Sequence, residues 1–202
     1  MKSSKTKAAL FLLLLVASSL PSVAGSVNMQ FNGTPTGNNY SGVPSYPYDL
    51  SVNGGPNQWM MCISYNEHIT GGETWSATAM SVGAFGALIG DNQKANELAY
   101  LFTLALADSG SNSVINAVAW DINEGAPALD LAAQALYNQV TSNVNFPSFA
   151  NVVVYVPING TQSWQGELPQ TFLGATPEPG TLVLVGSGLI GLAGTLRRKS
   201  RA

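Results

Sequence analysis

This 202-residue chain has only one cysteine and only eight lysines and arginines. Its single cysteine, Cys62, excludes an intrachain disulfide, so a folded domain has to be stabilised by its core. Seven of the eight lysines and arginines lie in the two termini, which leaves Lys94 as the one basic residue between Gly25 and Ala175. Ten acidic side chains share that stretch, so its formal net charge is −9. Such a surface repels phosphate backbones and makes nucleic acid a poor partner.

The N-terminus has the pattern of a signal peptide over residues 1–24. Three lysines precede the apolar stretch Ala8–Val16, and a small-x-small sequence, Ser22-Val23-Ala24, comes directly before Gly25. We therefore expect export of the chain, with cleavage between Ala24 and Gly25. A solitary thiol in an oxidising compartment is either buried and inert, paired with another molecule, or used in chemistry.

The C-terminus combines three elements in a fixed order. About 16 uncharged, apolar residues at about 1.5 Å rise each just cross a thin hydrocarbon layer, and a basic cluster after them stops transfer. The elements are Pro177, Glu178 and Pro179, then the apolar run Thr181–Leu196, then Arg197, Arg198, Lys199 and Arg201. A simple tail anchor with an accidental Pro-Glu-Pro is the alternative interpretation.

This order resembles the PEP-CTERM sorting signal of exported bacterial proteins, which a membrane protease called exosortase is thought to process. The resemblance implies three parts: a signal peptide (1–24), an extracytoplasmic globular domain (25–175) and a sorting signal (176–202). It implies two partners, exosortase and the inner membrane, which holds the precursor transiently. It also implies a mature protein at the cell surface or in an extracellular exopolysaccharide matrix such as a biofilm.

Between the termini the hydrophobic pattern predicts strands, then helices, then strands. Alternating or continuous apolar runs predict strands at Val27–Asn32, Leu50–Val52, Gln58–Tyr65, Glu73–Met80 and Val152–Val156, and a short one within Thr161–Leu173. Helical spacing predicts one helix capped by Asp91 and reaching Asp108, a second over Ser113–Asn123, and a third that begins near Pro127. The expected class is α+β, a mostly antiparallel β sandwich or barrel with about three helices inserted in its middle.

Four segments of the expected domain are similar to the thioester domains of bacterial surface adhesins. They are Tyr48–Gly54, Trp59–Tyr65, Val114–Ile122 and Pro169–Leu173. In that family a strand cysteine attacks the carboxamide carbon of a helix glutamine, within an Ile-Gln-x-Ala-Ile-Trp pattern, and expels ammonia. The resemblance implies that Cys62 is the nucleophile.

The same resemblance places an asparagine where the family has its glutamine. When Trp120 is matched to the tryptophan of the pattern, the electrophile position falls on Asn116. Asparagine is one methylene shorter, so its carbonyl carbon falls short of the sulfur, and misplacement on that scale abolishes a proximity-driven reaction. The structural alternatives are that Cys62 fills the core beside Met60 and that Asn116 bonds to a neighbouring strand or loop.

The remaining candidate residues are few. His68 would form a catalytic dyad with Cys62 only if the chain turned back, because six residues of strand at about 3.3 Å each separate the two by about 20 Å; we expect a surface histidine. Asp121 and Glu124 are typical of a solvated helix edge. Tyr40, Tyr46, Tyr48 and Trp164 are candidates either for stacking on sugars or for the core.

Metal ligands are not clustered in the sequence, so we expect no metal and no cofactor. The residues together favour a non-enzymatic adhesion or structural module, with a surface ligand or exopolysaccharide as partner. The alternative is a thioester-forming covalent adhesin or a cysteine-dependent enzyme that uses Cys62.

Overall fold

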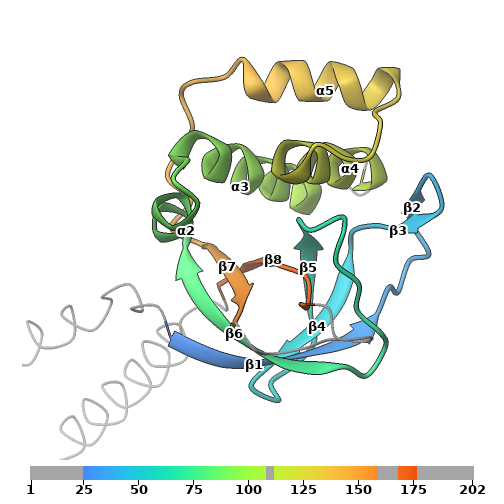
Figure 1. The fold of residues 1–202 in the computed structure, drawn as a ribbon, viewed down its shortest axis with the longest axis vertical. Coiled ribbons are helices and arrows are strands. Elements are labelled where there is room, and N and C mark those ends of the chain that lie inside the picture. The colour runs from blue at the N-terminus through green and yellow to red at the C-terminus, as the bar shows by residue number, and fades with distance from the viewer. Residues whose placement is uncertain (1–24, 108–111, 159–167, 177–202) are drawn as a thin grey trace, which may run out of the picture.

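The computed structural model describes residues 25–107, 112–158 and 168–176. Six antiparallel strands close into a barrel, in the order β1-β4-β5-β8-β7-β6, and β6 pairs again with β1 (Figure 1). The strands are β1 (Gly25–Gly33), β4 (Tyr48–Val52), β5 (Gln58–Cys62), β6 (Thr74–Ser81), β7 (Val152–Pro157) and β8 (Phe172–Ala175). A two-stranded ribbon of β2 (Asn39–Tyr40) and β3 (Val43–Pro44) projects beside it.

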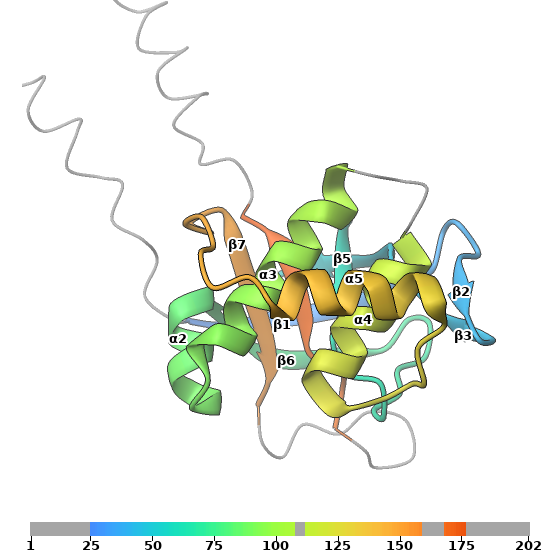
Figure 2. The same ribbon diagram turned by 90° about the horizontal axis from the view of Figure 1, so that it is seen from above.

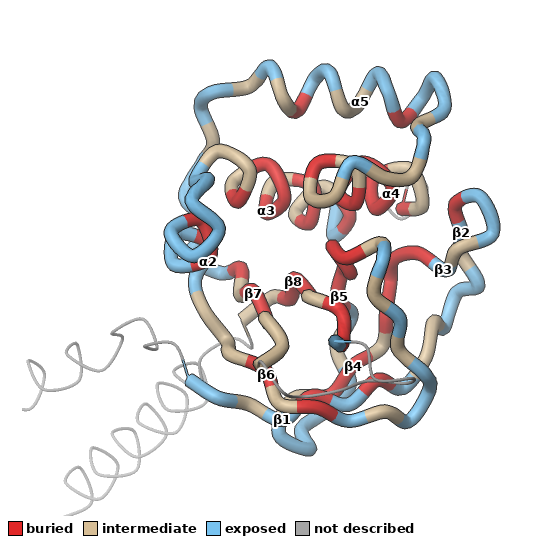
Figure 3. Tube along the Cα trace, viewed as in Figure 1, coloured by how far each residue is buried: buried red, intermediate tan, exposed pale blue. Residues whose placement is uncertain are grey.

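The helices of the described residues all lie between β6 and β7 in the chain. They are α2 (Val82–Ile89), α3 (Asn92–Ala107), α4 (Asn112–Glu124) and α5 (Leu131–Thr141). Helices α3 and α4 cover one open end of the barrel, and α5 lies across their outer side (Figures 1 and 2). Most of α5 is exposed, whereas α3 and α4 are largely buried, so the latter two seal the barrel (Figure 3).

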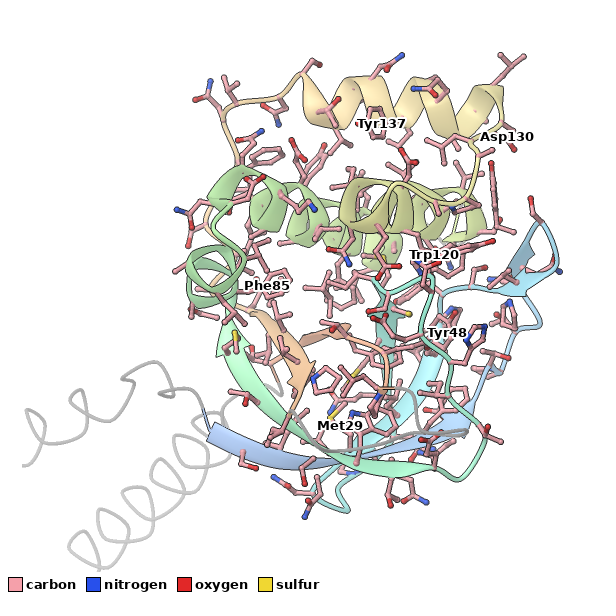
Figure 4. All side chains as sticks on the ribbon, viewed as in Figure 1. Met29, Tyr48, Phe85, Trp120, Asp130 and Tyr137 are labelled. Atoms are coloured by element: carbon pink, nitrogen blue, oxygen red, sulfur yellow. The ribbon has the colours of Figure 1, made fainter. Side chains whose placement is uncertain are left out.

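One hydrophobic core runs from the barrel into the helical layer. Figure 4 shows Met29 on the barrel wall that lies furthest from the helices and Trp120 beneath α4. Both side chains are almost fully buried, as are Met60, Leu98 and Phe172, which come from β5, α3 and β8. Burying apolar surface contributes about 25 cal/mol per Å² and stabilises the domain without a disulfide. Cys62, the single cysteine of the chain, is a free thiol.

The expected class is confirmed in its outline. The sheet is antiparallel and the helices are inserted in its middle, but the described residues form four helices there, where about three were expected. The sequence prediction missed α2, because Gly83 and Gly86 lower helix propensity by about 1 kcal/mol each. Ser81 nevertheless caps this helix by accepting from the backbone N–H of Ala84.

Several boundaries differ from the predicted ones for reasons that the structure shows. The strand expected over Gln58–Tyr65 ends at Cys62, because the carbonyl oxygen of Ile63 and the backbone N–H of Tyr65 bond to side chains at the end of α4. The third helix begins at Leu131 and not near Pro127, because the side chain of Asp130 accepts from Ala133 N at 2.9 Å and caps it there.

Other boundaries agree with expectation. Asp91 caps α3 by accepting from Lys94 N at 2.9 Å, as predicted. The last strand is an exception: β8 shares only Phe172 and Leu173 with the predicted segment and continues to Ala175, where it pairs with Val152 of β7. Trp164, which was expected in this strand, lies outside the described residues. Over the described ranges, no helix is long and apolar enough to cross a membrane, and the expected span at Thr181–Leu196 lies outside them.

Candidate functional site

Cys62 lies at the junction between the barrel and the helical layer. It is the last residue of β5, pairs with Phe172 of β8, and has no exposed surface. Its thiol donates to the backbone carbonyl oxygen of Ser64, with 3.0 Å between Sγ and O. Burial raises the pKa of the thiol, since a thiolate without water is costly. The cysteine is therefore a neutral thiol at physiological pH.

Asn116 faces Cys62 from the buried side of α4. Its side-chain nitrogen donates to the carbonyl oxygen of Cys62 at 2.7 Å, and its side-chain oxygen accepts from the backbone N–H of Tyr46 at 2.7 Å. The asparagine has no exposed surface. One carboxamide thus joins three segments that are far apart in the sequence: α4, the end of β5 and the loop before β4.

The chemistry of this pair is limited by those bonds. A thioester would require the thiolate to attack the carboxamide carbon of Asn116 and expel its nitrogen as ammonia. That nitrogen is bonded to a buried carbonyl, which would be left unpaired at a cost of about 1–3 kcal/mol. The thiol is also held in its neutral form and directed at Ser64. We call the two hydrogen bonds of the Asn116 carboxamide, to Cys62 O and from Tyr46 N–H, the clamp.

Trp120 completes the buried side of the junction. Its ring packs edge-on against Tyr65, with centroids 5.4 Å apart, and only about 1% of its surface is exposed. The indole N–H makes no conventional hydrogen bond to any described residue. Its interaction with the Cys62 side chain lowers the pKa of the thiol, but by less than burial raises it. The tryptophan therefore shields the cysteine from water and does not activate it.

The end of α4 fastens the segment that follows Cys62. One carboxylate oxygen of Glu124 accepts from the backbone N–H of Tyr65, at 2.9 Å, and from both the backbone and the side chain of Asn66. The side chain of Asn123 donates to Ile63 O at 2.8 Å. Glu124 is thus not the solvated helix edge expected from the sequence. A carboxylate at a helix C-terminus interacts unfavourably with the helix dipole. The position of Glu124 at the end of α4 was therefore the sequence signal that it has another binding partner.

Glu67 lies next to this carboxylate. Burial raises the pKa of the Glu67 carboxyl, and the neighbouring Glu124 carboxylate raises it further. Both acids also raise the pKa of Cys62, though less than burial does. The negative charge of the two carboxylates therefore opposes formation of the thiolate.

The other candidate residues are placed as follows. His68 is exposed, as expected from the sequence, whereas Cys62 is buried. Tyr40, Tyr46 and Tyr48 are buried and belong to the core, which excludes them as a stacking surface for sugars. Within the described residues, no three His, Cys, Asp or Glu side chains gather to hold a metal ion.

The predicted sorting residues lie outside the described part of the chain. These are Ala24, Pro177, Glu178, Pro179, Arg197, Arg198, Lys199 and Arg201, while Gly25 is the first described residue of β1. The folded domain reaches to Thr176, whose backbone N–H donates to Asn151 O at 2.9 Å. The barrel therefore ends one residue before the Pro-Glu-Pro sequence.

Comparison with known families decides what that C-terminal sequence is. Residues 175–199 match the PEP-CTERM protein-sorting motif. The match confirms the predicted sorting signal and implies that exosortase processes an exported, membrane-anchored precursor for display at the surface. It overlaps the barrel only at Ala175, the last residue of β8, and includes none of the four described helices.

No curated protein matches the chain. Among solved structures, the chain is similar to the N-terminal thioester domain of a surface protein from Clostridium perfringens, at 12% sequence identity and a TM-score of 0.47. That alignment covers 74% of this chain and 98% of the other.

Proposed function

We propose that the domain is a non-enzymatic adhesion or structural module of the cell surface or of an exopolysaccharide matrix. The sorting motif supports delivery to the surface. The observation that carries the non-covalent role is the carboxamide of Asn116, both ends of which are bonded to backbone groups at 2.7 Å. An amide used in this way stabilises the junction between helices and barrel, and it remains an amide.

A covalent module is the second candidate, because Cys62 and Asn116 are neighbours in the fold. In that case the sulfur would replace the amide nitrogen, with release of ammonia, and the resulting thioester would capture an amine of a partner. A cysteine-dependent hydrolase would instead need a thiolate, and burial, which raises the pKa of Cys62, opposes its formation.

Intact-mass measurement of the exported protein tests this proposal. We expect the mass of the processed chain without any loss, and no change after incubation with methylamine. A mass lower by one ammonia, restored with added methylamine and absent in Cys62→Ala, would establish the thioester and overturn the proposal. Hydrolase activity that both Cys62→Ala and His68→Ala remove would overturn it as well.

A separate experiment tests delivery to the surface. The full chain, tagged within an exposed turn, is followed between membrane, cell surface and medium in its host. We expect surface or matrix material with the full chain. A chain that lacks residues 177–202 should not be retained at the membrane on its way, and an unchanged distribution would contradict exosortase sorting.

A further inference from the structure

Helix α2 is apolar all round, although more than half of its residues are exposed. The helix, Val82–Ile89, has no charged or polar side chain. Three of its residues are buried against the domain, and the other five form an exposed outer face: Gly83, Ala84, Ala87, Leu88 and Ile89. A surface helix normally turns polar side chains outward, and a helix that is hydrophobic all round is normally buried. The outer face of α2 is therefore made for an apolar neighbour and not for water.

The outer face is continuous. Ala84, Ala87 and Leu88 are three and four residues apart, so they lie on one side of the helix. Leu88 is 61% exposed and Ile89 is 39% exposed. Single exposed apolar residues are ordinary on a protein surface, whereas an uninterrupted apolar face marks a contact with a partner or a membrane.

The end of β8 places the start of the sorting motif beside α2. Ser81, which caps the helix, pairs with Val153 of β7, and Val153 pairs with Gly174 of β8. Neighbouring strands are about 4.8 Å apart, so the helix begins about 10 Å from Gly174. The match to the sorting motif starts at the next residue. The chain thus leaves the barrel for the motif at the end of the domain that carries α2.

The start of β1 lies at this end as well. Gly25 pairs with Ala79, two residues before the helix cap at Ser81. Figures 1 and 2 both show α2 at the end of the domain where β1 begins. In Figure 4, Phe85 of α2 and Asp130, which precedes α5, lie on opposite sides of the molecule. Both ends of the domain therefore converge on α2, and the start of α5 is on the far side.

The length of the connecting chain brings the outer face to the bilayer. The sorting motif implies a membrane-anchored precursor, and its expected span begins at Thr181. Only residues 176–180 separate that span from the end of β8. At no more than about 3.5 Å per residue, this distance is at most about 20 Å. The anchored precursor therefore holds α2 within reach of lipid.

The charge of the domain decides the kind of contact. Residues 25–175 have a formal net charge of −9, so acidic headgroups do not attract them. The first charged residue after α2 is Asp91, whose carboxylate caps α3. The contact therefore has to be made by burial of Leu88 and Ile89, with Asp91 at the level of the headgroups. Eight residues at about 1.5 Å each cannot cross about 30 Å of hydrocarbon, so α2 would lie on the membrane and not span it.

We propose that the outer face of α2 lies in the membrane interface while the precursor is anchored, with Leu88 and Ile89 inserted among the lipid chains. This second contact holds the folded domain against the bilayer beside the sorting motif. A contact of this size is weak and reversible by itself, so it releases the domain once the anchor is removed. The proposal goes beyond the adhesion function and does not depend on it.

The test uses the full-length chain reconstituted in phosphatidylcholine vesicles, and flotation of the vesicles measures its anchoring. Nitroxide labels are attached at Leu88→Cys and, as the matched control, at Leu131→Cys. Leu131 is the first residue of α5 and is 92% exposed, so neither substitution disturbs the core. Cys62 has no exposed surface, and wild-type protein treated in parallel measures any label that it takes up.

Electron paramagnetic resonance then compares collisions of each label with oxygen, which concentrates in lipid, and with a nickel chelate, which stays in water. We expect the label at Leu88 to lie about 5–10 Å inside the interface and the label at Leu131 to lie in water. The depth of the Leu88 label should persist in about 1 M salt, where the Debye length falls to about 3 Å, because the contact is apolar.

Two exposed alanines provide a matched pair of variants in the chain labelled at Leu88→Cys. Ala87 lies on the outer face of α2, and Ala132 lies on α5. Ala87→Glu puts a charge where lipid chains should be, so we expect it to return the label to water. Ala132→Glu should leave the depth of the label unchanged.

Four outcomes would overturn the proposal: a Leu88 label as wet as the Leu131 label, loss of its depth in salt, equal depth in the two glutamate variants, or spin–spin coupling between Leu88 labels without contact with oxygen. The last would make the outer face a contact between two copies of the chain. A chain that does not float with the vesicles would refute the anchored precursor together with the proposal. The mass of the same samples reports on the thioester, so the adhesion function stands or fails separately.

Discussion

The side-chain nitrogen of Asn116 donates to the backbone carbonyl oxygen of Cys62 over 2.7 Å, which fastens helix α4 to the last residue of strand β5. The barrel and the helical layer are thereby joined by a neutral, fully buried amide.

Removal of the clamp should destabilise the domain. In Asn116→Ala the backbone N–H of Tyr46 and the carbonyl oxygen of Cys62 both lose their partner in a buried site. We expect a loss of about 2–4 kcal/mol in the free energy of unfolding, measured by urea denaturation. Asn138→Ala, on the exposed face of α5, is the control and should change it by less than about 0.5 kcal/mol. Equal effects of the two variants would refute the clamp.

Cys62 should be protected from alkylation in the folded protein. Its side chain has no exposed surface, and burial raises its pKa, so the reactive thiolate is scarce. We expect iodoacetamide at about pH 8 to label the native protein only at the rate of unfolding, and to label it rapidly in concentrated urea. Labelling of the native protein at the unfolded rate would show that the thiol is accessible.

Glu67 should make the folded state less stable as pH rises. Its native pKa lies above the ordinary value of 4.5, so the folded state binds its proton more tightly than the unfolded state does. Stability from this group is complete below about pH 4.5 and is lost as pH rises through the native pKa. Glu67→Gln keeps the neutral form at every pH. The variant should therefore gain stability relative to the wild type between pH 4 and 8 in urea titrations; a constant difference would contradict the shift.

The contact between α2 and α3 should depend on the absence of one methyl group. A Cβ atom on Gly86 would lie 2.4 Å from Asn92 Oδ1 and 2.9 Å from Asn92 Cα, and the latter is backbone. We expect Gly86→Ala to cost about 1–3 kcal/mol in thermal or urea unfolding. Gly83→Ala, in the same helix with nothing within 4 Å, should instead stabilise by about 0.4–1 kcal/mol. Stabilisation by both would refute the close approach.

The strands and the two middle helices could be predicted because their signals are local. The alternation of Val27, Met29 and Phe31 defines β1, and the cap at Asp91 defines the start of α3. Helix α2 could not be predicted, because its glycines oppose helix formation locally and are required by a contact with α3 that only the fold creates.

The candidate site divides in the same way. Cys62 and Asn116 could be selected from their segments, and the fold does bring them together. The contacts of Glu124 with Tyr65 and Asn66 span 59 and 58 residues of sequence, and the contact of Gln170 with Glu67 spans 103. No periodicity in the sequence encodes contacts over such separations. The aromatic residues near β3 were ambiguous in the sequence because a tyrosine serves a core and a surface equally well.

The place of β8 in the barrel has a consequence for export. This four-residue strand lies between β5 and β7, yet it is the last element of the domain to leave the ribosome and the membrane channel. Until it arrives, β5 and β7 each keep an open edge, which is the usual starting point for aggregation. The barrel can therefore close only when translocation has reached the residues at which the sorting motif begins. Completion of the fold thus coincides with arrival of the sorting motif.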